Sequence, residues 1–315
     1  MKNKVKQLKA EISKHIIGHN DMIDAILVGV LSQGHILIEG VPGLAKTTAV
    51  NAIAQAIGLD FRRIQFTADL LPSDILGTEV YHPKTEEFIL KKGAIFTHLL
   101  LCDEINRSSA KVQSALLEVM QEKQVTIGND SFKLEEPFCV LATQNPIDQE
   151  GTYTLPEAQL DRFMMKIIVE YNTEIEEFEI AKKASNHTFE PIVEVIHKTD
   201  LLHMQEDVQN IYIDDALTAH IVKLIFATRN PSKYGLESLE NVIEYGASPR
   251  ATIDMIKAVK ASAYLREKEQ VSPIDIALCI KNVLRHRIVL SYEAQVENIS
   301  TDDVIDTLSK TMEIV

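Results

Sequence analysis

A loop at residues 40–47 combines the residue types that bind phosphate groups. The loop and the residue after it read Gly40, Val41, Pro42, Gly43, Leu44, Ala45, Lys46, Thr47 and Thr48. Glycines allow backbone N–H groups to turn toward an anion, and a helix that begins after the loop adds the positive end of its dipole. At this spacing Lys46 can reach the outer phosphates of a nucleotide, and the Thr47 hydroxyl can bind magnesium. Ala45 stands where the usual pattern has its second glycine, and alanine is the smallest replacement.

Two acidic residues, Asp103 and Glu104, follow an apolar run at residues 98–102. Ligands of open α/β sheets bind at the carboxyl ends of the strands, which is where these carboxylates would lie. We expect Asp103 to hold magnesium through water, and Glu104 to orient and deprotonate an attacking water. Acids after a strand are often only part of a solvated turn. Their combination with the phosphate-binding loop favours the catalytic interpretation.

Asn145 and Arg250 are candidates for sensing the phosphates. Asn145 follows a second apolar run, so its amide can detect the outer phosphate or position a water; alternatively it is a turn residue before proline. Arg250 lies in the first turn of a predicted helix, where its charge opposes the helix dipole. Contact with a bound phosphate would explain that placement, whereas by itself Arg250 would be interpreted as a surface residue.

Arg162 ends a short predicted helix and is a candidate for action on a neighbouring subunit. Phosphoryl transfer spreads negative charge over oxygens, and an arginine supplied in trans is worth about 10³ to 10⁵ in rate. The alternative is a local ion pair with Asp161 or Glu157.

The candidate residues follow stretches that we predict as strands and helices of one domain. Apolar runs predict strands at residues 35–39, 98–102, 137–143 and 163–169, and residues 61–66 are predicted to form another short strand. Helical spacing of apolar residues covers 47–57 and 109–122. Strands that alternate with helices predict an α/β fold with a parallel sheet. Two insertions, residues 69–96 and a hairpin at 124–135, should project from that sheet.

The second half of the chain is predicted to be helical. Helices are expected at residues 176–186, 200–208, 214–229, 251–266, 273–290 and 301–310. Asp214, Ser272 and Thr301 precede three of them as caps. With a boundary near Tyr171, the sequence predicts a nucleotide-binding α/β domain at residues 1–171 and a helical domain at residues 172–315.

The composition limits the classes of partner. The 315 residues include 46 acidic and 32 basic side chains, a net charge of −14. Nucleic-acid binders derive much of their affinity from basic surface, so the charge argues against nucleic acid as a partner. No apolar run is long enough to predict a membrane span, and the charged start argues against a signal peptide, so we expect a cytoplasmic protein. The three cysteines match no metal-binding spacing and are expected to be reduced thiols.

Taken in order, these motifs resemble those of AAA+ ATPases, and finer phrases are similar to the MoxR branch of that family. The phrases lie at residues 40–47, 63–67, 71–74, 103–107, 142–146 and 246–251. The resemblance extends over nearly the whole chain, from about residue 16 to residue 287. An alanine at the position of Ala45 is ordinary in that branch.

The resemblance implies an AAA+ core with insertions, a helical lid, and ATP and Mg²⁺ as ligands. Asn145 would be sensor 1, Arg162 the arginine finger and Arg250 sensor 2. Ile17 and Gly18 match the segment that packs around adenine. The family, found in bacteria and archaea, assembles as rings, commonly hexamers, with each site between subunits. Its members often act with proteins that carry a von Willebrand factor A domain.

The favoured function is an ATPase that remodels or activates a protein partner in the manner of a chaperone. A magnesium-chelatase-like motor or a nucleic-acid motor is the alternative within enzymes, and the charge argues against the latter. A nucleotide-gated scaffold with little turnover is the alternative of another class, against which the complete set of hydrolytic residues argues. Neither the client nor the ring size is marked in the sequence.

Overall fold

The computed structural model describes residues 2–41, 43–84, 86–146, 152–186 and 190–312. The chain forms two compact units and passes between them more than once. The first unit comprises Met1–Ile23, His35–Arg162 and Ile167–Leu202, and the second comprises Asp24–Gly34, Phe163–Lys166 and His203–Val315. The single domain boundary near Tyr171 therefore stays a prediction.

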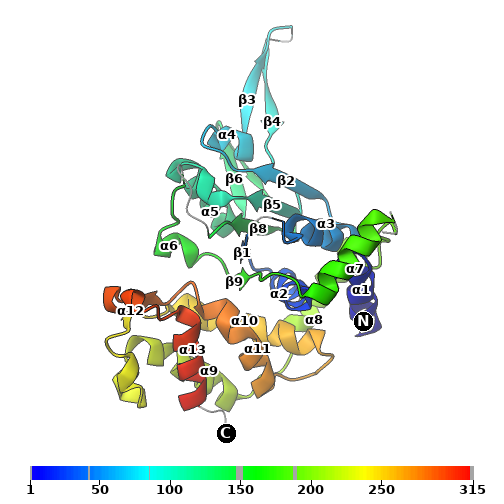
Figure 1. Ribbon diagram of the computed structural model, residues 1–315. Helices are drawn as coiled ribbons and strands as arrows, with labels where there is room; N and C mark the ends of the chain where they lie inside the picture. Colours follow the sequence, from blue (N-terminus) through cyan, green and yellow to red (C-terminus); the bar gives the residue numbers. More distant parts are fainter. Residues whose placement is uncertain (1, 42, 85, 147–151, 187–189, 313–315) are drawn as a thin grey trace. The chain divides into compact units, whose positions relative to one another are not determined.

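A five-stranded sheet carries the candidate residues, and Figure 1 shows its strands stacked one above another. Their order is β2 (Phe61–Gln65), β5 (Leu99–Asp103), β8 (Cys139–Gln144), β1 (Ile36–Glu39) and β9 (Met165–Ile168). The pairs β2–β5, β5–β8 and β8–β1 are parallel, which confirms the predicted parallel sheet. All five residues of β5 are buried, as expected for a strand that is covered on both faces.

The strand order brings three carboxyl ends together. Because β8 lies between β5 and β1, the residues that follow these three strands meet at one edge of the sheet. The segments concerned are the loop after Glu39, the acids at the end of β5, and Asn145 after β8. Helix α3 (Lys46–Ala56) begins directly after the loop, and α5 (Ala110–Glu122) follows the acids.

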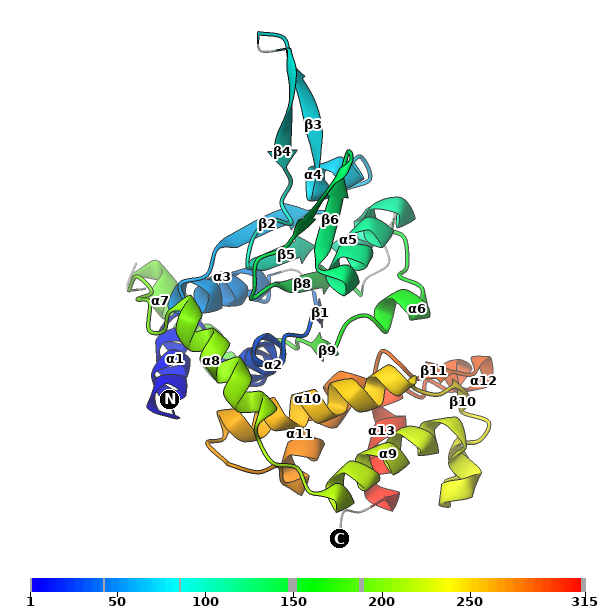
Figure 2. The same cartoon turned by 180° about the vertical axis from the view of Figure 1, so that it is seen from behind.

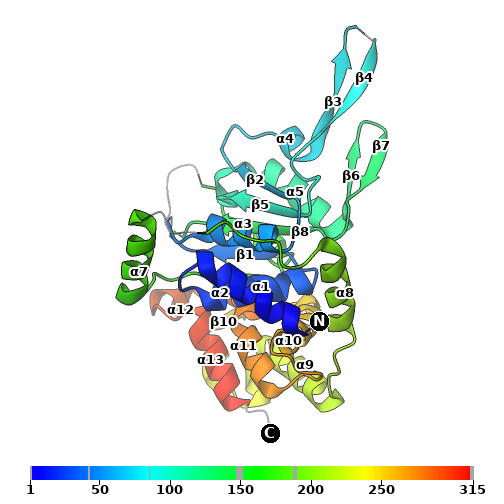
Figure 3. The ribbon, with the colours of Figure 1, turned by 90° about the vertical axis from the view of Figure 1, so that its right-hand side faces the viewer.

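Two β-hairpins extend from the first unit, side by side in Figure 3. The predicted hairpin is confirmed as β6 (Gln124–Ile127) and β7 (Asp130–Lys133). The other insertion holds α4 (Pro72–Leu76) and a longer hairpin of β3 (Gly77–His82) and β4 (Glu87–Lys92), which the sequence analysis did not resolve. Two exposed apolar pairs, Val80 with Ile89 and Tyr81 with Phe88, lie on its opposite faces.

Two N-terminal helices, α1 (Lys2–His15) and α2 (Asn20–Leu31), were not predicted from the sequence. The remaining elements before α9 are a 3-10 turn (Ile105–Arg107), α6 (Glu157–Leu160), α7 (Glu174–Ser185) and α8 (Lys198–Gln209).

The second unit is mainly helical, as predicted, and its helices are seen best in Figure 2. They are α9 (Asp215–Arg229), α10 (Pro249–Leu265), α11 (Pro273–Leu284), α12 (Tyr292–Val296) and α13 (Thr301–Thr311). The helix predicted at residues 273–290 ends at Leu284. After it, β11 (Val289–Leu290) pairs with β10 (Ile243–Tyr245), and both strands are too short to show an alternating pattern in the sequence. Asp214 caps α9 as predicted, whereas α13 is capped by Ser300 rather than by Thr301.

Within the described part of the chain, no helix combines the length and hydropathy needed to cross a membrane. Cys102, Cys139 and Cys279 are buried and none of them is in a disulfide, and burial raises the pKa of the Cys139 thiol to about 12. Such a thiol stays protonated and packs as a small apolar residue.

Candidate functional site

A pocket of about 320 Å³ lies at the carboxyl edge of the sheet and gathers most of the predicted site residues. The residues that line it are Gly40, Gly43, Leu44, Ala45, Lys46, Thr47, Thr48, Arg63, Gln65, Asp103, Glu104, Thr143 and Asn145. They come from four strand ends that are separate in the sequence. Val41 is not among them, and Pro42 lies outside the described residues.

The loop brings the ammonium group of Lys46 and the backbone at Gly43 to this pocket. The ammonium of Lys46 donates a hydrogen bond to the carbonyl of Gly40 at 2.5 Å, so it lies over its own loop. Burial lowers the pKa of Lys46, and the nearby carboxylates of Asp103 and Glu104 oppose that shift. Gly43 has φ +92°, and a Cβ there would meet nothing within 4 Å. The loop therefore offers room for an anion beside a charged lysine.

Ala45 has left-handed backbone angles, φ 52° and ψ 18°, directly before α3. This conformation costs a residue with a side chain roughly 1 kcal/mol more than glycine. We therefore expect Ala45→Gly to retain nucleotide affinity and to raise the free energy of unfolding by at most about 1 kcal/mol, because glycine's greater freedom in the unfolded chain offsets part of the gain. Urea unfolding and nucleotide titration check this. Ala45→Val, with a branched side chain, should be clearly destabilised. An equal loss of unfolding free energy in Ala45→Gly and Ala45→Val would contradict the view that the backbone of Ala45 is strained.

The carboxylate of Asp103 is held from three sides. Its Oδ2 accepts from Arg63 Nε at 2.5 Å and lies 3.5 Å from the hydroxyl of Thr47, while its Oδ1 accepts from Thr143 Oγ1 at 3.1 Å. Arg63 is supplied by β2, the strand beside β5. The side chain of Asp103 is thus oriented toward the hydroxyl that follows Lys46.

Glu104 also has left-handed backbone angles, φ 56° and ψ 52°. Its carboxylate accepts a hydrogen bond from Gln65 Nε2 at 3.0 Å and forms an ion pair with Arg107, whose Nε lies 2.9 Å away. Its backbone N–H donates to Thr143 Oγ1 at 2.9 Å. Non-glycine residues in this region of backbone space concentrate at functional sites, where neighbouring contacts maintain the strain. These contacts aim the Glu104 side chain into the pocket.

Four residues around the acids were not identified as site residues from the sequence, namely Arg63, Gln65, Arg107 and Thr143. Arg63 and Gln65 are polar residues two apart on one strand, and both line the pocket. That alternation was a readable signal, but it acquires meaning only when β2 is placed next to β5. Thr143 touches both acids and so acts as their common support.

The remaining predicted residues lie outside the pocket lining. The guanidinium of Arg162 donates to the carbonyl of Leu117 in α5 at 2.9 Å. The segment of Ile17 and Gly18 lies against Asn172, whose amide donates to the Ile17 carbonyl at 3.1 Å. Arg250 belongs to the second unit, where its N–H donates to Ser248 Oγ at the start of α10.

The donor set fits a magnesium-bound phosphate chain. Thr47 and Asp103 offer neighbouring oxygens, which are the ligands that Mg²⁺ prefers. Among the described residues no group of three or more His, Cys, Asp and Glu side chains is placed to hold a metal by itself. A cation here would take its other ligands from water and phosphate, as Mg²⁺ usually does in nucleotide sites.

Comparisons with known proteins cover both units. A family model for ATPases associated with various cellular activities matches residues 35–165, and a model for the AAA lid domain matches residues 238–308. Chaperone MoxR1 of Mycobacterium tuberculosis is 45% identical over 302 residues, which are 96% of this chain and 80% of that protein. Protein YeaC of Bacillus subtilis is 41% identical over 305 residues, with 96% and 92% covered. A crystal structure from Cytophaga hutchinsonii matches with a TM-score of 0.94 at 48% identity, and covers 100% of this chain and 96% of that one.

Proposed function

Because the chain belongs to the MoxR family of AAA+ ATPases, we propose that it hydrolyses ATP in the pocket of the first unit and uses the cycle to remodel or activate a protein partner. One observation carries the proposal. Lys46, Thr47, Asp103, Glu104 and Asn145 come from three separate segments and line the same pocket. A passive nucleotide binder has no need of a carboxylate held beside the phosphate site.

In this proposal each residue has a separate task. The loop N–H groups and Lys46 bind the phosphates, and Asn145 contacts the outermost one or its water. The carboxylate of Glu104 accepts the proton of the attacking water, while Gln65, Arg107 and Thr143 maintain its orientation. A bound Mg²⁺, held by Thr47 and through water by Asp103, would neutralise phosphate charge.

Three assignments extend beyond the pocket. Arg162 would act on the nucleotide of the neighbouring subunit in a homo-oligomeric ring, commonly a hexamer, and its absence from the lining of its own pocket supports this role. Arg250 would contact phosphate from the first turn of α10, and Ile17 with Gly18 would pack around the adenine.

The partner is proposed to be a protein, with von Willebrand factor A domain proteins as the first class to test. The relative from Mycobacterium tuberculosis is named a chaperone. The β3–β4 hairpin exposes apolar side chains on both faces, and its Phe88 is 68% exposed. Exposed apolar clusters of this kind mark sites of protein interaction.

The first test is ATP turnover by the purified chain with Mg²⁺, with excess EDTA, and with Lys46→Ala. We expect turnover only for the wild type with Mg²⁺, because removing Mg²⁺ or the Lys46 ammonium leaves phosphate charge unneutralised. The loss should be at least about 10²-fold, by analogy with the removal of one electrostatic stabiliser from other active sites. Lys111→Ala, an exposed lysine on α5, is the control that should match the wild type. Tight ATP binding and ring formation with negligible turnover, even with a partner, would favour a scaffold instead.

A further inference from the structure

Three of the four residues that follow Arg162, at positions 163–166, accept hydrogen bonds from side chains through their backbone carbonyls. The carbonyl of Phe163 accepts two hydrogen bonds, from His286 Nε2 at 2.9 Å and from Arg287 Nη2 at 2.8 Å. The carbonyl of Met164 accepts from Arg287 Nη1 at 3.1 Å. Both donors follow the end of α11, more than 120 residues later in the chain, and all of these residues belong to the second unit.

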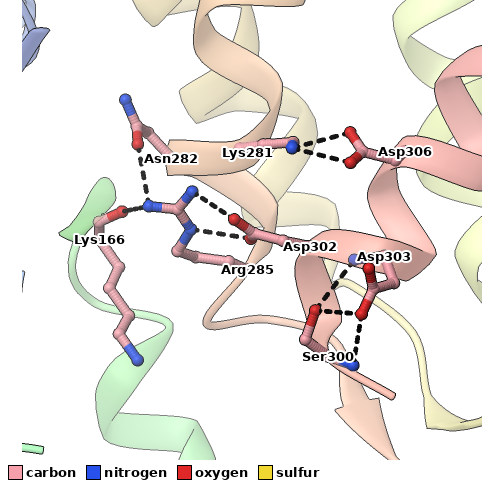
Figure 4. Close-up of polar contacts among 8 residues, drawn as sticks. All are labelled: Lys166, Lys281, Asn282, Arg285, Ser300, Asp302, Asp303 and Asp306. Carbon is pink, nitrogen blue, oxygen red and sulfur yellow. Dashed lines mark hydrogen bonds and ion pairs between the residues drawn. The ribbon is translucent and has the colours of Figure 1, made fainter. Parts of the chain in front are cut away.

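A third consecutive residue, Arg285, continues the same row of contacts. Figure 4 shows its guanidinium between the Lys166 carbonyl, at 3.3 Å, and the carboxylate of Asp302. Two bonds to Asp302, at 3.1 and 2.8 Å, hold that guanidinium in a fixed plane. Residues 285, 286 and 287 therefore hold three of the four carbonyls that follow Arg162.

Arg287 also connects this segment to the helix that carries Arg250. Its Nη2 lies 2.6 Å from Asp254 Oδ2, and Asp254 is one turn after Arg250 on α10. The side chain of Arg287 is 1% exposed and that of Asp254 is 13% exposed. A buried pair of this kind is costly to disturb, because removing one charge leaves the other without compensation.

The hydrogen bond to the Phe163 carbonyl determines which ring nitrogen of His286 carries the proton. A carbonyl oxygen only accepts, so Nε2 must carry the hydrogen that it donates to Phe163. Burial and the adjacent Arg287 lower the pKa of His286 well below its usual value. The ring is therefore neutral at physiological pH, and its bond to Phe163 is a neutral N–H donor to a carbonyl.

We propose that His286 and Arg287 are positioning residues for Arg162, which they orient by fixing the backbone that directly follows it to the helix carrying Arg250. The inference rests on the proposed function, in which Arg162 completes the active site of a neighbouring subunit. Catalytic groups must be held to a fraction of an ångström, and a group displaced by about 1 Å can cost about 10²-fold in rate. Neither positioning residue needs to touch nucleotide for its loss to slow the reaction.

Mixed rings separate this role from any effect on a subunit's own nucleotide site. Arg162→Ala subunits keep an intact pocket, and Lys46→Ala subunits keep an intact finger, so a mixture should regain turnover. We place His286→Leu or His286→Gln in the Lys46→Ala chain, which can contribute to turnover only through its Arg162. Glutamine can offer an amide N–H near the place of Nε2, whereas leucine of similar size offers no donor.

The Lys46→Ala/His286→Gln chain should restore turnover to Arg162→Ala as well as Lys46→Ala does. The Lys46→Ala/His286→Leu chain should restore about tenfold to a hundredfold less. Ring assembly, thermal unfolding and ADP binding are measured on every mixture. Equal restoration by the leucine and glutamine chains would overturn the positioning role. Failure of the parent mixture, with assembled mixed rings, would instead refute action of Arg162 in trans, and the positioning role with it.

A second variant keeps the test decisive if His286→Leu does not fold. Arg287→Lys retains the charge opposite Asp254 but cannot bond to both Phe163 and Met164 in the planar arrangement that arginine provides. In the Lys46→Ala chain it should also lower restoration by about tenfold or more while the rings assemble. Full restoration by this variant would count against the proposal.

Discussion

Replacing Glu104 by glutamine is expected to lower ATP turnover by about 10² to 10⁴-fold, the usual worth of a positioned general base. That range corresponds to about 2.7 to 5.4 kcal/mol of activation free energy. An amide cannot accept the proton of the attacking water. Its oxygen can still accept the hydrogen bond from Gln65 and lie beside the guanidinium of Arg107, so the pocket should keep its geometry. Phosphate release measured beside ATP affinity will show a loss of turnover without a comparable loss of binding.

The matched control for this variant is Glu118→Gln on α5, which makes the same chemical change at an exposed position. It should leave turnover unchanged. Equal, near-zero rates for the wild type and Glu104→Gln in an assembled sample would remove the support for hydrolysis. If the prediction holds, the slowed variant should also retain its protein partner during purification from the native cell, which would identify the client.

Arg162→Ala is expected to lower turnover by about 10³ to 10⁵-fold, the range found when an arginine finger is withheld. ATP and ADP affinity should change little, because Arg162 does not line the pocket of its own chain. The variant also loses one hydrogen bond to the Leu117 carbonyl. That bond contributes only about 1 kcal/mol to folding, so the protein should still assemble.

Arg62→Ala is the matched control for the lost hydrogen bond, since Arg62 Nη1 likewise donates to a backbone carbonyl, that of Gly93, at 3.0 Å. It should retain turnover with a similar change in stability. Mixing Arg162→Ala with Lys46→Ala then tests the direction of action. If assembled mixtures never exceed the turnover of either variant alone, Arg162 does not serve a neighbouring subunit.

Local patterns in the sequence were sufficient for the five strands of the main sheet and for the chemistry of the main site. Four apolar runs of five to seven residues and the mixed run at residues 61–66 predicted five strands, and all five are present in the sheet. The loop at Gly40 and the acids at Asp103 and Glu104 were readable because their residue types follow strand ends, and strand ends of a parallel sheet share one edge. The cap at Asp214 was readable because a cap depends on a few neighbouring residues, whereas the cap of α13 was placed one residue too late, at Thr301 instead of Ser300.

The partners of the acids could not be read in this way. Arg63 and Gln65 come from β2, and their meeting with Asp103 and Glu104 depends on which strand lies beside β5. The longer hairpin was missed because its exposed strands carry apolar pairs on both faces, so they lack the alternation of a strand with one buried face.

The amino-acid sequence by itself determined the family, the parallel sheet, the phosphate-binding loop and the acidic pair, because each is recognised from one or several short motifs. Only the tertiary structure decided that Thr143 supports both acids and that residues 285–287 hold the backbone after Arg162. Those contacts join residues that lie about 40 to more than 120 positions apart. Their formation depends on strand order and helix packing, which are properties of the whole chain and of no single segment.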